Sequence, residues 1–172
     1  MKLLFFILTF AVLISTGIVA QRMVLPTDSF NIQGKIAKEV VFTMAELDTF
    51  SKVMIKDQII YNQKGEPKDT VKNLKGILLK DLLISVEYLY DKPRQLNEFY
   101  FVFTASDGYR VVFSWNEIYN TEAGNQFYIV TEMGGMTLKE MEERILFIST
   151  ADLKAGRRYI KGLKSIEVKQ LD

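Results

Sequence analysis

The chain has 172 residues, a formal net charge of +1, 48% hydrophobic residues, and neither cysteine nor histidine. Without thiolate or imidazole groups it cannot form a disulfide, a thiolate-ligated metal centre or a nucleophile that histidine activates. The small net charge argues against nucleic-acid binding, which usually needs a basic face. The composition therefore favours a binding domain over an enzyme.

The N-terminal 20 residues have the pattern of a secretory signal peptide. Lys2 supplies a positive charge, an apolar run extends from Leu3 to Ala20, and polarity returns at Gln21. We expect cleavage after Ala20 and export by the general secretory route to the periplasm or another extracytoplasmic space. The alternative is an uncleaved membrane anchor, because the run is about long enough to cross a bilayer.

The rest of the chain has the length of one domain. Residues 21–28 are expected to be a short tether, in which Pro26 stops any helix, and residues 29–172 the folded domain. Thr43 and Glu46 have the spacing of a capping box, which predicts that a helix begins at residue 44. In this half we expect strands at 29–36, 40–42 and 52–61, a loop at 62–73, and helices at 44–51 and 80–86.

Apolar side chains alternate on both faces through residues 98–104, which predicts a central strand covered on both sides. Ser106, Asp107 and Gly108 then give a hairpin turn signal. The later elements are expected to be strands at 109–114, 126–133, 144–150 and 164–168, with one helical turn at 115–119. Many short strands with a few short helices predict an α+β fold with a curled mixed β-sheet core.

Two polar segments are candidates for binding. Arg157, Arg158, Lys161 and Lys164 lie close together in the sequence, and their side chains suit a phosphate or another anion. Ordinary surface charge is the alternative interpretation. The turn at 107–109 could place Asp107 and Tyr109 at a pocket rim, although a simple hairpin explains it equally well.

Three segments together resemble a known family. They are Lys75–Leu83, Ala105–Tyr109 with the apolar strand that follows, and Gly156–Val168. Their order and spacing resemble the molybdopterin-binding domain of the sulfite oxidase type, in its small stand-alone bacterial form. The resemblance extends from Phe30 to Val168 and implies the curled, mainly β core of that family.

The resemblance also implies a cofactor site, from which this sequence departs. Active members hold molybdenum through a pterin dithiolene and a cysteine, and the matching loop here, Ile59–Gly65, contains no thiol. Tyr61 or Asn62 would face the same place. Arg158 and Lys161 fall on the basic positions of the segment close to the cofactor phosphate. Gly162 replaces the usual tryptophan, and the histidines that commonly hold the cofactor are missing.

These observations give three hypotheses. The first is an exported, non-catalytic domain that keeps the scaffold, has no cofactor, and binds a small anionic ligand or a partner protein. The second is a molybdopterin-dependent oxidoreductase with a non-cysteine ligand, such as an oxygen of Tyr61 or water. The third is an unrelated carbohydrate-binding or hydrolytic domain. The sequence favours the first, with Arg158, Lys161, Asn62, Tyr61, Asp107 and Tyr109 as the candidate binding residues and a membrane contact only through an uncleaved leader.

Overall fold

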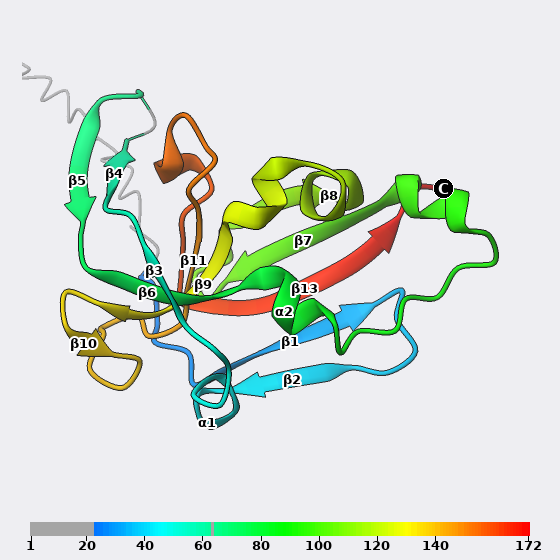
Figure 1. Ribbon diagram of the computed structural model, residues 1–172, viewed down its shortest axis with the longest axis horizontal. Coiled ribbons are helices and arrows are strands. Elements are labelled where there is room, and N and C mark those ends of the chain that lie inside the picture. Colours follow the sequence, from blue (N-terminus) through cyan, green and yellow to red (C-terminus); the bar gives the residue numbers. More distant parts are fainter. Residues whose placement is uncertain (1–22, 63) are drawn as a thin grey trace, which may run out of the picture.

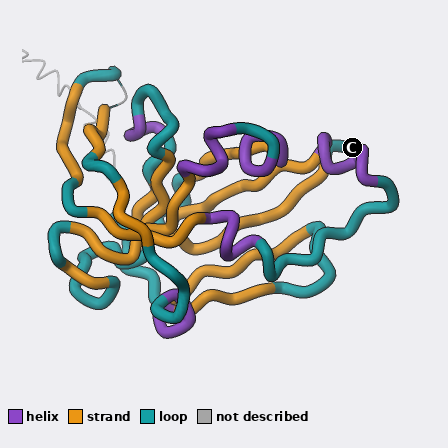
Figure 2. The backbone as a smooth tube through the Cα atoms, in the orientation of Figure 1, coloured by secondary structure: helices purple, strands orange, loops and turns teal. Residues whose placement is uncertain are grey.

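Strands make up most of the regular structure in the computed structural model, which describes residues 23–62 and 64–172 (Figure 2). The expected signal peptide lies outside the described residues. Within the part of the chain that is described, no helix is long and apolar enough to span a membrane.

The first sheet is mixed. Its five strands follow the order β2 (Val40–Thr43), β1 (Ser29–Gly34), β13 (Leu163–Gln170), β7 (Phe99–Ala105) and β8 (Arg110–Ser114). β1 and β13 are parallel, and the other neighbouring pairs are antiparallel. β1 and β13 run toward the end of the molecule where the C-terminus lies, and β7 runs beside β13 in the opposite direction (Figure 1).

The second sheet is antiparallel. Its strands follow the order β12 (Ile160–Lys161), β11 (Leu146–Ser149), β9 (Phe127–Met133), β6 (Leu74–Leu78) and β3 (Val53–Ile55), and β10 (Met136–Thr137) pairs with β9. A separate two-stranded ribbon consists of β4 (Gln58–Tyr61) and β5 (Pro67–Val71). In Figure 1 this ribbon stands away from both sheets, at the end of the molecule opposite the C-terminus.

The helices are short. They are α1 (Met44–Leu47), α2 (Leu79–Leu83) and α3 (Trp115–Tyr119), with 3-10 turns η1 (Pro93–Glu98), η2 (Glu122–Gln126) and η3 (Ala155–Arg157). The predicted capping box is confirmed, because the Thr43 hydroxyl accepts the Glu46 N–H at 3.2 Å and the Glu46 carboxylate accepts the Thr43 N–H at 2.7 Å. The helix ends at Leu47, four residues earlier than expected.

Phenylalanine rings of both sheets meet in the core. Phe103 of β7 lies 4.7 Å from Phe147 of β11, and Phe113 of β8 lies 4.8 Å from Phe127 of β9, measured between ring centroids. All four side chains are fully buried. The mixed β architecture with short helices is therefore confirmed, but the expectation of a curled sheet is wrong, because two facing sheets enclose the core without one sheet having to curl around it.

The segment from residue 52 to residue 73 also differs from expectation. The predicted strand at 52–61 is interrupted at Lys56 and Asp57, so β3 stays in the second sheet while β4 leaves it. The predicted loop contains β5, which pairs with β4. Four of the five β5 residues are exposed, and such a strand lacks the apolar alternation by which strands are recognised.

The tether is packed against the domain where it is described. The Ser106 hydroxyl accepts the Leu25 N–H at 2.9 Å and donates to the Leu25 carbonyl at 2.7 Å. Asp28 forms an ion pair with Arg144. Gly162, with φ +60°, lies so close to the Leu25 carbonyl that a side chain there would collide with it. The tether thus approaches the domain through the hairpin turn between β7 and β8.

Candidate functional site

A cleft of about 550 Å³ lies between the β4–β5 ribbon and the segment 156–161. Its volume is within the range of small-molecule sites. On the ribbon side, Ile60 and Asp69 are cross-strand partners, and Val71 shares the face of Asp69 because it lies two residues further along β5. The ribbon therefore gives this wall an apolar surface with a carboxylate beside it.

The opposite wall comes from β12 and η3. Tyr159, just before β12, and Lys161 both line the cleft, whereas Ile160 between them is fully buried. Arg157 of η3 and Met133 at the end of β9 complete this side. An aromatic ring, a thioether and two cations thus face the apolar wall of the ribbon.

The two walls approach closely at Gly156. A Cβ atom at this position would collide with the Tyr61 carbonyl, so only glycine allows η3 to pack directly on β4. The Lys154 ammonium lies 3.4 Å from the Gly65 carbonyl oxygen and 6.0 Å from the centroid of the Tyr61 ring. These contacts hold the ribbon against the loop that precedes β12.

Tyr109 and Asp107 connect the β7–β8 hairpin to the cleft in different ways. Tyr109 lines the cleft, and its hydroxyl donates to the Arg157 carbonyl at 2.5 Å. Asp107 accepts the Tyr109 backbone N–H at 2.8 Å, at the turn where Gly108 has φ +83°. Asp107 stabilises the turn, and the Tyr109 side chain connects the hairpin to the cleft wall.

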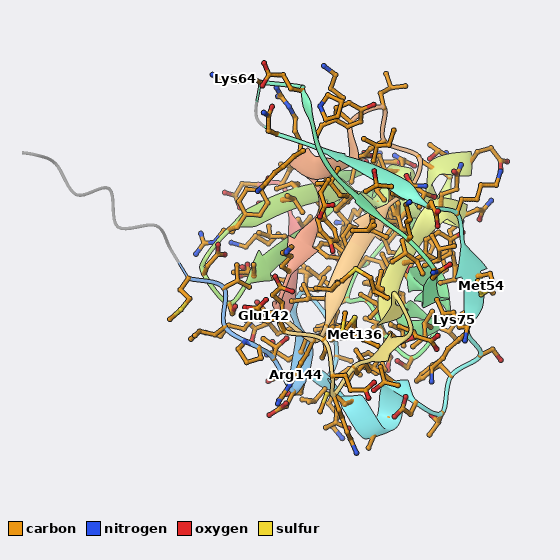
Figure 3. The ribbon with its side chains drawn as sticks, turned by 90° about the vertical axis from the view of Figure 1, so that its left-hand side faces the viewer. Met54, Lys64, Lys75, Met136, Glu142 and Arg144 are labelled. Carbon is orange, nitrogen blue, oxygen red and sulfur yellow. The ribbon has the colours of Figure 1, made fainter. Side chains whose placement is uncertain are left out.

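Asn62 lines the cleft, but its side chain is occupied within the ribbon turn. Its amide oxygen accepts the backbone N–H groups of Lys64 and Glu66 at 2.9 and 3.0 Å. Its amide nitrogen donates to the Glu66 carboxylate at 2.9 Å. Figure 3 shows Lys64 at the outer tip of this turn, away from the body of the domain. Asn62 therefore organises the turn that ends the ribbon.

Lys161 and Tyr159 share an acidic neighbourhood. The Lys161 ammonium lies 2.6 Å from the Glu143 carboxylate, and about half of its side chain remains exposed, at 44%. Burial raises the pKa of the Tyr159 phenol well above its usual value, and the negative charges of Glu143 and Asp69 raise it further. Tyr159 thus stays protonated and able to donate a hydrogen bond across the physiological pH range.

Arg158 does not line the cleft. Its guanidinium donates to both Asp152 oxygens, at 2.8 and 2.5 Å, and to Glu117 at 2.8 Å. It also stacks on the Phe113 ring, 4.3 Å from the centroid. Burial raises the pKa of Glu117, but hydrogen bonds from Ser114 and Arg158 outweigh this effect and hold the pKa below its usual value. The resemblance places Arg158 near the cofactor phosphate. Here its guanidinium instead joins α3, β8 and the loop that contains Asp152.

Four of the six candidate binding residues therefore meet at one cleft: Tyr61, Asn62, Tyr109 and Lys161. Arg158 and Asp107 do not line it. Lys68, Asp69 and Met133 also line the cleft, and no pattern in the sequence pointed to them. Lys68 and Asp69 were hidden because β5 has the polar sequence of a loop, and Met133 because a methionine at a strand end carries no binding signal of its own.

The donor atoms do not fit a cysteine-ligated molybdenum cofactor. The whole sequence contains neither cysteine nor histidine. In the described ranges, no group of three or more acidic residues is arranged to hold a metal ion. Lys161 remains at the cleft, whereas the Arg158 guanidinium is bound to carboxylates elsewhere. We therefore assign no chemical step to a metal or a pterin.

The fold is similar to part of a solved enzyme structure. The sulfane dehydrogenase SoxCD from Paracoccus pantotrophus matches with a TM-score of 0.56 over 83% of this chain, at 15% sequence identity. The present chain spans 39% of the length of that protein chain. No family model matches the sequence, and a search of curated proteins finds no match either. At this identity the similarity concerns the fold alone.

Proposed function

We propose that this protein is a non-catalytic binding domain that takes a small anionic ligand in the cleft between the β4–β5 ribbon and the segment 156–161. The observation that carries the proposal is the composition of the cleft. Three cationic side chains, Lys68, Arg157 and Lys161, surround a partly apolar interior. Cationic side chains at a concave, partly dry site favour an anion, since charge-assisted hydrogen bonds are among the stronger polar contacts.

We further propose that the scaffold is related to the molybdopterin-binding domain that the sequence resembles. The fold similarity to sulfane dehydrogenase SoxCD supports this relationship. The absence of cysteine supports loss of the metal site, because the sulfur donor of that family has no counterpart in this chain. Export by the general secretory route, proposed from the N-terminal pattern, would also deliver an unfolded chain without a cofactor.

A ligand titration tests the proposed function. We expect inorganic phosphate, sulfate or benzoate to raise the unfolding temperature, and Lys161→Gln combined with Lys68→Gln to weaken this effect about tenfold or more. Lys38→Gln is the matched control, because Lys38 is exposed and does not line the cleft. If none of the three anions stabilises the wild-type protein, the proposed function is wrong.

A further inference from the structure

The hydroxyl group of Tyr159 is the starting point. It belongs to a half-buried side chain that lines the cleft, and the contact described for it is a long one, 3.9 Å to the thioether sulfur of Met133. A thioether is a weak acceptor. Buried tyrosine hydroxyls usually find a stronger partner, so an oxygen atom of a ligand would suit this position better.

Lys161 provides a second donor in the same cleft. Tyr159, just before β12, and Lys161, within it, both line the cleft, from positions about 6–7 Å apart if the chain is extended there. Glu143 holds the Lys161 ammonium at 2.6 Å from its carboxylate, which fixes one end of a flexible side chain while leaving other donor hydrogens available. A neutral phenol and an ammonium can together bind the two oxygens of one carboxylate.

The charges around the cleft favour a single negative charge on the ligand. Lys68, Arg157 and Lys161 are positive, and Asp69 and Glu143 are negative. Lys154 beside the Tyr61 ring and Glu66 beside Asn62 add one charge of each sign, so the cations exceed the carboxylates by one. A monoanion would neutralise the site, whereas a phosphate dianion would leave excess negative charge beside Asp69 and Glu143, at a cost that grows as water is excluded.

The remaining surface favours an apolar ligand body. Ile60 and Val71 are buried at 8% exposure each and form an apolar wall facing the two donors, and Met133 adds apolar surface beside Tyr159. A cleft of about 550 Å³ is larger than a carboxylate needs. An alkyl chain or an aryl ring would bury its surface there and gain hydrophobic free energy in proportion to the area removed from water.

We infer that the ligand is an amphiphilic monocarboxylate, whose carboxylate binds the Tyr159 hydroxyl and the Lys161 ammonium while its apolar body packs on Ile60, Val71 and Met133. This inference rests on the proposed function and adds the chemical class of the ligand. It also makes Tyr159 the residue that selects a carboxylate, a role that the resemblance does not give it.

Calorimetric titration of the purified protein with matched pairs of probes tests the inference. Octanoate and phenylacetate should bind, octanamide and phenylacetamide should bind at least about tenfold more weakly, and acetate should lose affinity because it lacks the apolar body. Tyr159→Phe should weaken octanoate binding about 10- to 100-fold, as expected for a hydrogen bond to a charged group. Tyr90→Phe, an exposed position that does not line the cleft, should bind as the wild type does.

Two further variants separate binding from folding. Lys161→Gln should weaken octanoate much more than octanamide, because the lost ammonium charge attracts a carboxylate but not a neutral amide. Val71→Thr, close in shape, should weaken octanoate binding more than acetate binding.

Equal affinity for octanoate and octanamide, or unchanged octanoate affinity in Tyr159→Phe, would overturn the inference. Binding of phosphate or sulfate without octanoate would overturn it and leave the proposed function standing, whereas no binding of any anion would remove both.

Discussion

Arg158 fixes the loop 150–158 to the body of the domain by contacts with two carboxylates and one aromatic ring. Asp152 is the more buried of its partners, with 10% of its side chain exposed. Asp152 also accepts the Ser149 hydroxyl hydrogen at 2.7 Å, so the cluster links β11 to the cleft wall. Arg158 is therefore a structural residue whose removal leaves two carboxylates without their cation.

Substitution of Arg158 by methionine should lower the free energy of unfolding by about 2–3 kcal/mol. Removing one partner of a fully buried ion pair costs about 3–5 kcal/mol, and the cost here is smaller because water reaches Glu117. Urea unfolding measures the difference. Arg94→Met, at an exposed position, should change stability by less than about 0.5 kcal/mol. Equal stability of the two variants would show that the Arg158 contacts are not maintained in solution.

Glu117 should make stability depend on pH in the acid range. Its pKa in the folded state lies below the ordinary value of 4.5, so the unfolded state binds a proton at higher pH than the folded state does. The stabilisation is therefore complete above about pH 5, decreases as pH falls below 4.5, and is lost once the folded carboxyl is protonated. Glu117→Gln should show a shallower decrease between about pH 5 and pH 3 in thermal unfolding.

A decrease of equal slope in the wild type and in Glu117→Gln would contradict this origin. Glu122→Gln is a suitable control, because Glu122 is an exposed carboxylate near the same helix. The control should retain the wild-type slope. The comparison separates the Arg158 cluster from the general effect of protonating surface carboxylates.

The β4–β5 ribbon packs against η3 through a close contact at Gly156. Gly156→Ala should destabilise the protein by about 1–3 kcal/mol, because the added methyl group meets the Tyr61 carbonyl and forces η3 and β4 apart. Urea unfolding gives the energy, and hydrogen exchange of the ribbon amides should accelerate as the ribbon loosens. If hydrogen exchange of the ribbon amides is unchanged in Gly156→Ala, η3 and β4 do not pack closely.

Gly134→Ala provides the matched control. No atom lies within 4 Å of a Cβ built at Gly134, so its cost comes only from the backbone angle φ of +61°. That cost is about 1–2 kcal/mol and should leave exchange of the ribbon amides unchanged. The two alanine variants thus distinguish a steric collision between elements from local backbone strain.

The contrast between β7 and β5 explains which elements the sequence could predict. Phe99, Phe101 and Phe103 alternate with partly exposed residues, so one buried face was recognisable from the spacing. The expected cover on the second face is not found, since Val102 lies beside exposed Val112 on the open side of the sheet. β5 has almost no buried face, and its strand character comes from hydrogen bonds to β4, which sequence spacing does not reveal.

The cleft could be predicted only in part for a related reason. The sequence identified Tyr61, Asn62, Tyr109 and Lys161 as candidates, and all four line it. It did not reveal that Arg158 turns toward Asp152 and Glu117, because neighbouring arginines in a chain can point to different sides. The meeting of residues 60–71 with residues 156–161 is a property of the tertiary structure, set by where the ribbon leaves the second sheet.

The composition of the whole chain leads to a prediction about metal content. Protein purified from a host that synthesises the molybdenum cofactor should contain molybdenum well below one atom per chain by elemental analysis. Cysteine supplies the protein ligand in the family that the sequence resembles, and this chain has no cysteine or histidine to replace it. The control is a cysteine-ligated molybdopterin enzyme made in the same host. It must contain its full complement of molybdenum, which shows that the cofactor was available. Stoichiometric molybdenum together with pterin in this protein would mean that oxygen donors such as Tyr61 suffice, and it would reverse the choice of a binding domain over an enzyme.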